Sequence, residues 1–272
     1  MSIERGTELA EAVVDNRETL TVLEEKGRLT SQQLEQELEY SRATINRHLA
    51  ALREVELITT ESGKHALSDF GTIVLHEFGE LCHQLHISAQ IPDLVEQLYS
   101  CPVDFDIRIL AGSTVTRANF EDPYQMHERY LGFWNETERV KGVRSVSAVP
   151  PDIVERIKPK LRSDTEVESI WTPKAATQYL ETYPEIKSLW MEEPNARMLI
   201  THESISGQFG LFDHRLAFTV HDEEPGYPYA LVDTANPEAL EWARDLYEYY
   251  LARSQPLDAW VAASEQQNFD QG

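Results

Sequence analysis

The 272-residue sequence has few cysteines and no long apolar run. Its two cysteines, Cys82 and Cys101, cannot build a disulfide-stapled scaffold or a zinc site of four thiolates. No stretch of about 18 apolar residues is present, and the N-terminus has no basic segment followed by an apolar one. We therefore expect neither a membrane span nor a signal peptide. The protein is expected to be cytoplasmic.

Positive charge is also scarce, because 24 basic residues face 47 acidic ones, for a net charge of −23. Only seven of the basic residues are lysines, and the acids are spread along the whole chain. A cationic partner or an ordinary acidic protein would be compatible with this composition. We favour a halophilic protein, in which hydrated carboxylates keep the surface soluble at high salt.

Familiar catalytic motifs are missing as well. The sequence contains no G-x-S-x-G, Walker A, G-x-G-x-x-G or H-E-x-x-H pattern, and paired acids carry no signal in so acidic a chain. We predict no catalytic residue, no metal and no cofactor. An α/β enzyme with an appended winged helix is kept as an alternative.

One window of the acidic N-terminal part has no acid at all. Residues 1–71 carry a net charge of −6, yet 40–53 contains three arginines and one histidine, with glutamates on both flanks. An Asp-x-x-Glu capping box at 15–18 and a stop at Gly27 predict a helix before this window. Thr30 is placed to cap a short helix before this window, and Ser41 is placed to cap a second helix within it.

Each of the two capped helices has an apolar stripe, and only a very short segment links the two helices. The stripes consist of Leu34 and Leu38 in the first helix and Ile45, Leu49 and Leu52 in the second. Only Glu39 and Tyr40 separate the helices, which predicts a helix-turn-helix. Residues 57–60 and 65–67 around Ser62-Gly63 predict a β-hairpin behind it, completing a winged helix.

The outer face of the second helix suits DNA. Arg47 is the best candidate to hydrogen-bond the edge of a guanine, and Asn46 could pair with an adenine. The small Ala43 and Ala50 would let the helix approach the bases closely. Arg42 and Arg53 fit phosphate contacts better. The predicted DNA-binding residues are Ser41, Arg42, Ala43, Thr44, Asn46, Arg47 and Arg53 in the helix, and Thr60, Ser62, Lys64 and His65 in the wing.

A further helix follows Gly71 and has a coiled-coil-like seam. Val74, Phe78, Leu81 and Leu85 recur at spacings of four, three and four. We predict that this seam joins two subunits into a homodimer, with packing on the chain's own C-terminal domain as the alternative. The same helix holds His76, Cys82, His83 and His86, which leaves a metal- or redox-sensing regulator as a second alternative.

Beyond residue 100 the pattern alternates between strands and helices. Strands are expected over 103–109, 144–149, 166–171, 197–200, 208–212, 216–220 and 230–232, and helices over 122–140, after Pro151, after Thr172-Pro173, around 183–191 and from Asn236 to about Ser254. This order predicts an α/β effector-type domain with a mixed sheet.

Two parts of the sequence resemble known families. Residues 29–71 resemble the winged helix-turn-helix of bacterial and archaeal transcription regulators, through the segments LTSQQLEQELEYSRATINRHLAALREVELI and HALSDFG. One position departs from that family: Glu39 stands in the turn where glycine is common, and it should adopt a left-handed conformation. The segments DPYQMHERYLGFWNETERVKGV, GLFDHRLAF and ALVDTANPEALEWARDLYEYYLARSQPL are similar to haloarchaeal regulators with a methanogenesis-regulator effector domain, related to archaeal sugar-sensing regulators. The resemblance implies a phospholipase-D-like fold, whose catalysis needs a His-x-Lys pair. None of the nine histidines has lysine at that offset, so it implies a regulator.

An effector site can be predicted from the usual position of ligands beyond the carboxyl ends of strands. Gly112 to Thr114 would follow the first strand and Trp171-Thr172 the third, and arginines and Lys141 in two acid-free windows, 108–117 and 139–144, would attract a sugar or phosphosugar. The predicted effector-binding residues are Arg108, Ser113, Thr114, Arg117, Trp171 and Thr172. Surface ion pairs and core aromatics are the alternative interpretation.

The sequence thus predicts an α+β protein of four parts. These are a winged helix-turn-helix over 1–71, a linker and dimerisation helix over 72–100, an α/β effector-binding domain with a mixed, phospholipase-D-like sheet over 101–257, and an acidic C-terminal tail over 258–272. The predicted function is a homodimeric, sequence-specific repressor that binds double-stranded promoter DNA under the control of a small metabolite.

Overall fold

A computed structural model describes residues 2–117, 122, 124–147, 149–221 and 228–270. The chain divides into two compact units, Met1–Leu85 and His86–Gly272, which we call unit 1 and unit 2. No helix among the described residues is both long enough and apolar enough to cross a membrane.

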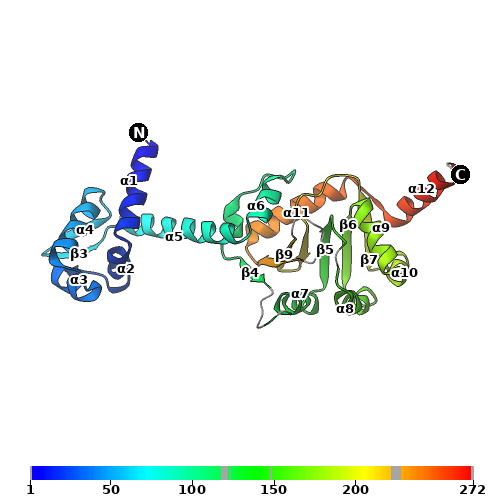
Figure 1. The fold of residues 1–272 in the computed structure, drawn as a ribbon, viewed down its shortest axis with the longest axis horizontal. Helices are drawn as coiled ribbons and strands as arrows, with labels where there is room; N and C mark the ends of the chain where they lie inside the picture. The colour runs from blue at the N-terminus through cyan, green and yellow to red at the C-terminus, as the bar shows by residue number, and fades with distance from the viewer. Residues whose placement is uncertain (1, 118–121, 123, 148, 222–227, 271–272) are drawn as a thin grey trace. The chain divides into compact units, whose positions relative to one another are not determined.

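Unit 1 is a winged helix (Figure 1). Its elements are α1 (Ser2–Asp15), α2 (Arg17–Lys26), β1 (Leu29–Thr30), α3 (Ser31–Leu38), α4 (Arg42–Glu54), β2 (Ile58–Glu61), β3 (Lys64–Leu67) and α5 (Asp69–Gln90), whose last residues belong to unit 2. The three strands form an antiparallel sheet in the order β1-β3-β2. The predicted helix-turn-helix and hairpin are therefore confirmed.

Local signals explain the helix-turn-helix. The Thr30 side chain caps α3 in a full capping box with Gln33, and Ser41 Oγ accepts a hydrogen bond from the Thr44 amide at 3.2 Å. Glu39 adopts the predicted left-handed conformation, with φ 54°. The apolar stripes of both helices meet in one core, in which Leu34, Ile45, Leu49 and Leu52 are buried.

The start of the chain differs from the prediction. Residues 15–18 do not form a capping box, because α1 runs up to Asp15 and Asn16 stands at the N-cap of α2 without a side-chain capping bond. The Asn16 amide instead donates to the Ala12 carbonyl oxygen at 2.8 Å. The stop at Gly27, with φ 73°, is confirmed.

Unit 2 is built on one eight-stranded mixed sheet. Its elements are α6 (Pro92–Tyr99), the 3₁₀ helix η1 (Ile107–Leu110), β4 (Thr114–Arg117), α7 (Gln125–Asn135), β5 (Arg139–Arg144), α8 (Pro151–Leu161), β6 (Glu166–Trp171), α9 (Pro173–Thr182), α10 (Pro184–Glu192), β7 (Ala196–Thr201), β8 (Phe209–Phe212), β9 (Arg215–Val220), β10 (Ala230–Thr234), α11 (Pro237–Leu251), β11 (Ser254–Pro256) and α12 (Leu257–Asp270). The strand order is β11-β7-β6-β5-β8-β9-β10-β4, with parallel pairing only along β5-β6-β7 within the described sheet. The predicted α+β class and mixed sheet are confirmed.

The sheet of unit 2 is covered on both faces. One face packs against α6, η1 and α11, and the other against α7, α8, α9 and α10 (Figure 1). A buried carboxylate ties α7 to the sheet: Asp233 of β10 accepts hydrogen bonds from Arg129 Nε at 2.5 Å and Nη2 at 3.0 Å and also pairs with Arg215. Such an arrangement satisfies the carboxylate inside the protein.

Two of the predicted strands are wrong. The apolar residues of 103–109 end in η1, which Asp106 caps through a hydrogen bond from the Arg108 amide at 2.9 Å, and no strand is found there. The strand expected over 144–149 lies at Arg139–Arg144 instead, where it pairs on both sides with β6 and β8. The helix expected over 122–140 is the shorter α7; Pro123, its predicted start, lies outside the described residues.

Candidate nucleic-acid interface and effector pocket

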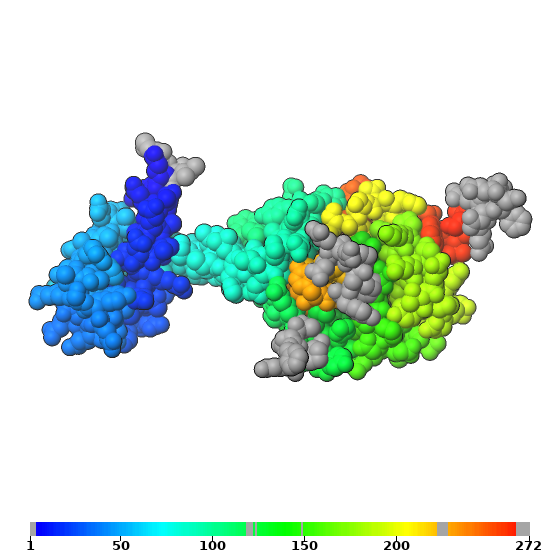
Figure 2. Space-filling model, in the orientation of Figure 1, coloured from blue at the N-terminus to red at the C-terminus, as the bar shows by residue number. Residues whose placement is uncertain are grey.

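One face of α4 is buried and the opposite face is open. Ile45, Leu49 and Leu52 point into the core, and their burial holds the helix in place. Ala43, Asn46, Arg47 and Ala50 are all exposed. Figure 2 shows this part of unit 1, coloured mid-blue, at the surface. The structure therefore brings the small and the hydrogen-bonding residues predicted for DNA onto one accessible ridge.

The arginines around this ridge differ in their partners. No acidic side chain in the described part of the chain lies within ion-pair distance of Arg47. Arg42 lies 3.9 Å from a carboxylate oxygen of Glu35, and Arg53 Nε donates to the Leu49 carbonyl oxygen at 3.1 Å. Arg47 is thus the arginine of α4 best placed to contact a new partner.

Several glutamates near the ridge already have basic partners inside unit 1. The pairs are Glu35 with Arg42, Glu37 with Lys26, Glu56 with Arg5 and Glu61 with Arg28. All four pairs lie near the surface, where one ion pair stabilises by no more than about 1 kcal/mol. Their effect here is to reduce the negative charge that an approaching phosphate would meet.

The predicted wing residues fall into two groups. Thr60, Ser62 and Lys64 are exposed on the hairpin. His65 is only 7% exposed, with Nδ1 2.9 Å from Thr60 Oγ1 and Nε2 3.2 Å from Ser31 Oγ. Burial, and then the charge of Arg53, lowers the pKa of His65. The expected DNA contact of His65 does not fit this position, since the imidazole is enclosed between the wing and α3.

His48 of α4 has a similar supporting position. Its Nδ1 lies 3.0 Å from Thr19 Oγ1 of α2, and its ring packs edge-on against Tyr40. Burial is the largest cause that lowers the pKa of His48, followed by the charge of Arg47. Both histidines of the helix-turn-helix and wing therefore favour the neutral form and fix neighbouring elements.

The seam predicted on α5 is divided in the structure. Val74 and Phe78 are partly buried against the core of unit 1, whereas Leu81 and Leu85 are 48% and 58% exposed. The first two residues are thus used within the subunit, which corrects their assignment to the dimer contact. Leu81 and Leu85 continue the same face of the helix and remain open.

The metal-sensing alternative finds no site in the part of the chain that the structure describes. His76, Cys82, His83 and His86 are all exposed on α5, and no group of three possible ligands is found among the described residues. His86 Nε2 lies 2.9 Å from the side-chain amide of Gln90.

The predicted effector residues do not come together. Thr114 and Arg117 lie on the edge strand β4, and four strands separate β4 from Trp171 on β6, which places them about 24 Å apart at ~4.8 Å per strand. Their misplacement follows from the wrong strand at 103–109. Arg108 pairs with Asp106, Arg117 donates to the Gln90 carbonyl oxygen, Ser113 precedes β4, and Thr172 caps α9.

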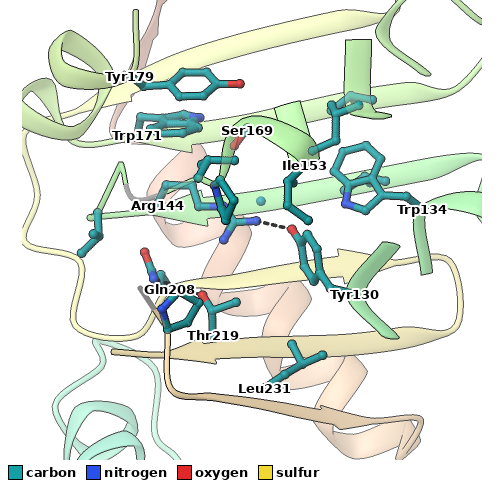
Figure 3. Close-up of a pocket in the computed structure, with 18 of the residues that line it drawn as sticks. Tyr130, Trp134, Arg144, Ile153, Ser169, Trp171, Tyr179, Gln208, Thr219 and Leu231 are labelled. Atoms are coloured by element: carbon teal, nitrogen blue, oxygen red, sulfur yellow. Dashed lines mark hydrogen bonds between the residues drawn. The ribbon is translucent and has the colours of Figure 1, made fainter. Parts of the chain in front are cut away.

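A cavity of about 90 Å³ lies elsewhere in unit 2, at the carboxyl ends of the parallel strands β5 and β6. Trp171 and Tyr179 stack on one side with ring centres 4.7 Å apart, and Trp134 and Tyr130 stand opposite (Figure 3). Aliphatic residues complete most of the lining, namely Met126, Val140, Val146, Val149, Ile153, Ile157, Val167 and Leu231. The cavity has the apolar lining expected of a small-molecule site.

Few polar groups enter this cavity. Arg144, at the end of β5, donates from Nη2 to the Tyr130 hydroxyl at 2.6 Å (Figure 3). Gln208 donates from its amide to Thr219 Oγ1 at 3.1 Å. Of the residues predicted for the effector, only Trp171 and Thr172 are nearby. The acid-free window did mark Arg144, but Gln208 and Trp134 come from distant segments and had no sequence signal.

A second, more polar cavity of about 470 Å³ adjoins the first. The two share Val146, Gln208, Thr219 and His221. The second cavity extends to Asp93, Glu96 and Gln97 of α6. A ligand at the shared residues would therefore lie close to the helix that follows α5 in the chain.

A winged helix joined in one chain to an α/β unit with an apolar pocket is an arrangement typical of transcription regulators. Residues 123–253 match the family model described as the middle domain of methanogenesis regulatory protein FilR1, and residues 5–90 match the HVO_A0261 N-terminal domain. The two matches together place a FilR1-type middle domain behind an HVO_A0261-type N-terminal domain in this chain, and they support a DNA-binding transcription regulator. A comparison with curated proteins finds no match.

The solved structures that match this chain have low sequence identity and TM-scores below 0.5. TrmBL2, an archaeal chromatin protein, is 12% identical with a TM-score of 0.41, over 88% of this chain and 92% of that one. NucT from Helicobacter pylori is 15% identical with a TM-score of 0.39, over 53% of this chain and 98% of that one. The phospholipase D family member Nuc from Salmonella typhimurium is 9% identical with a TM-score of 0.40, over 53% and 97%.

Proposed function

We propose that the chain is a sequence-specific DNA-binding repressor whose α4 enters the major groove. The observation that carries this proposal is the open ridge of α4, where Asn46 and Arg47 project between two alanines. Arginine can bind guanine and asparagine adenine through paired hydrogen bonds, and alanine lets the helix approach the bases. Ser62 and Lys64 of the wing would contact the neighbouring phosphates.

The proposed active form is a homodimer. Leu81 and Leu85 are four residues apart on α5, and a second copy of the same helix would cover them. A two-fold dimer would place two copies of α4 about 34–36 Å apart, which matches successive major grooves on one side of the duplex. Residues 1–71 would then bind DNA and 72–100 would dimerise.

Residues 101–257 would hold the effector that sets DNA binding, and the protein would be no enzyme. The cavity between β5, β6 and α7 supports a site for a small molecule in this unit. The histidines lack the His-x-Lys spacing that the phospholipase-D-type reaction needs. A cytoplasmic location agrees with binding to promoter DNA.

The test is to select binding sites for the full chain from a random pool of DNA duplexes. We expect enrichment of an inverted repeat with half-site centres about 10–10.5 base pairs apart. Asn46→Ala combined with Arg47→Ala should abolish the enrichment. Arg17→Ala is the matched control, because Arg17 faces α5 while Thr19, on the opposite side of α2, contacts α4.

Two results would overturn the proposal. One is a wild-type chain that enriches no sequence from the pool. The other is an enrichment that survives the double α4 substitution unchanged, because the reading surface would then lie elsewhere.

A further inference from the structure

The cavity in unit 2 combines a largely apolar lining with one arginine, Arg144. Arg144 is half-buried at its wall, and the one hydrogen bond that its side chain makes among the described residues goes to the hydroxyl of Tyr130. In contrast, Arg139 on the same strand pairs with Asp213 at 3.2 Å, and Lys141 pairs with Glu248 at 3.1 Å. Arg144 therefore stands out from the other cations of β5 in lacking a carboxylate partner within the described chain.

Glu168 is the single acid among the described residues that line the cavity, and it does not neutralise Arg144. Successive side chains of a strand point to opposite faces, so Glu168 faces away from Ser169 and Trp171. Its carboxylate pairs with Arg197 on that other face. A partly buried guanidinium with no counter-charge among the described residues is costly unless something compensates it, and an anionic ligand would do so.

Other buried polar atoms around the cavity also lack partners among the described residues. They include the indole N–H groups of Trp134 and Trp171, which are donors, and the side-chain oxygen of Gln208, an acceptor. Gln208 is only 6% exposed and lies where the two cavities meet. Arg144 and the indole N–H groups are all hydrogen-bond donors, so the wall suits a ligand that carries an anionic acceptor group.

We propose that this cavity binds a small aromatic monocarboxylate, with its carboxylate on Arg144 and its ring between the Trp171–Tyr179 stack and Trp134. The inference rests on the proposed role of unit 2 as an effector domain and replaces the expected sugar. A sugar has hydroxyls on every side, and each would lose its hydrogen bonds to water against an apolar wall. The volume of about 90 Å³ is of the same order as the ~150 Å³ apolar cavity that holds one benzene ring, so a ligand with one small ring is a suitable size.

Benzoate and its neutral isostere benzamide are the probes for this site. Three tryptophans, Trp134, Trp171 and Trp190, line the cavity, so tryptophan fluorescence of the full chain reports occupancy directly. We expect saturable binding of benzoate, and binding of benzamide weaker by about 10- to 100-fold, because the charge-assisted hydrogen bonds are lost. Arg144→Gln should weaken benzoate binding by a similar factor, whereas Arg139→Gln should leave it unchanged.

Each outcome decides the inference. Equal binding of benzoate and benzamide, binding of glucose 6-phosphate in preference to benzoate, or no saturable binding by any probe would overturn it. If Arg144→Gln does not fold, the benzoate and benzamide comparison on the wild-type chain still decides. Selection of DNA sites without any probe keeps the two proposals apart, because failure there removes the DNA-binding function and leaves the chemistry of the cavity standing.

Discussion

Lowering the pH from about 8 to about 5 should weaken the attachment of the wing to the rest of unit 1. His65 is enclosed between Thr60 and Ser31, and burial followed by the charge of Arg53 lowers its pKa. An unfolded histidine titrates near pH ~6.5. Below that pH the unfolded chain binds the proton before the folded chain does, so the free energy of unfolding falls as the pH falls toward the lowered pKa.

The size of the effect is bounded by the number of protons involved. One histidine changes the free energy of unfolding by at most about 1.4 kcal/mol per pH unit. His48 also has a lowered pKa, so the two together give at most about 2.7 kcal/mol per pH unit. His65→Asn removes one of them and should roughly halve the slope. It should also cost about 1–2 kcal/mol at neutral pH through a lost hydrogen bond and poorer packing.

Amide hydrogen exchange of the peptide covering 58–67, corrected for the intrinsic rate at each pH, measures this opening in the full chain. All five tryptophans lie at position 134 or beyond, so fluorescence follows unit 2 separately in the same sample. A variant His65→Asn with the same pH slope as the wild type would refute the assignment of the proton to His65.

Three further predictions concern assembly, folding and salt. Leu81→Asp with Leu85→Asp should give monomers in light scattering, whereas Val14→Asp, at a position 60% exposed on α1, should not; a persistent dimer would place the interface elsewhere. Asp233→Asn should lower the free energy of unfolding, measured in urea, by about 2–4 kcal/mol. This is less than a fully buried ion pair would lose, because Arg129 and Arg215 each keep about a third of their side-chain area exposed. An unchanged urea midpoint would contradict this prediction. Affinity for the selected DNA should stay flat or rise between about 0.2 and about 2 M KCl, because cations taken up beside the glutamates of residues 1–71 offset counterion release; a steep fall would contradict the halophilic interpretation.

Much of the fold could be predicted because its helix ends carry local chemical signals. Thr30, Ser41, Thr172 and Asn236 all accept the capping hydrogen bonds that their sequence contexts indicate. The helix-turn-helix and the exposed face of α4 follow from the spacing of the buried residues Ile45, Leu49 and Leu52. The apolar alternation over 103–109 was misleading, since a run this short fits a strand and an irregular segment with a 3₁₀ turn equally well.

The pocket could not be predicted because its walls come from segments far apart in the sequence. Arg144 ends β5, while Gln208 precedes β8, and antiparallel pairing of these strands brings them close. Pairing order within a sheet is a tertiary property that no local pattern encodes. The divided seam on α5 has a similar cause, because only the folded winged helix shows that Val74 and Phe78 are already used.

Base reading by α4 is tested most directly by measuring Arg47→Ala on the selected operator and on duplexes that change each base pair in turn. The variant should lose about 1–3 kcal/mol on the selected operator and lose base preference at one position in each half-site, while Arg17→Ala keeps both affinity and preference. An equal loss on every duplex would make Arg47 a phosphate contact. No loss on any duplex would contradict DNA recognition by α4.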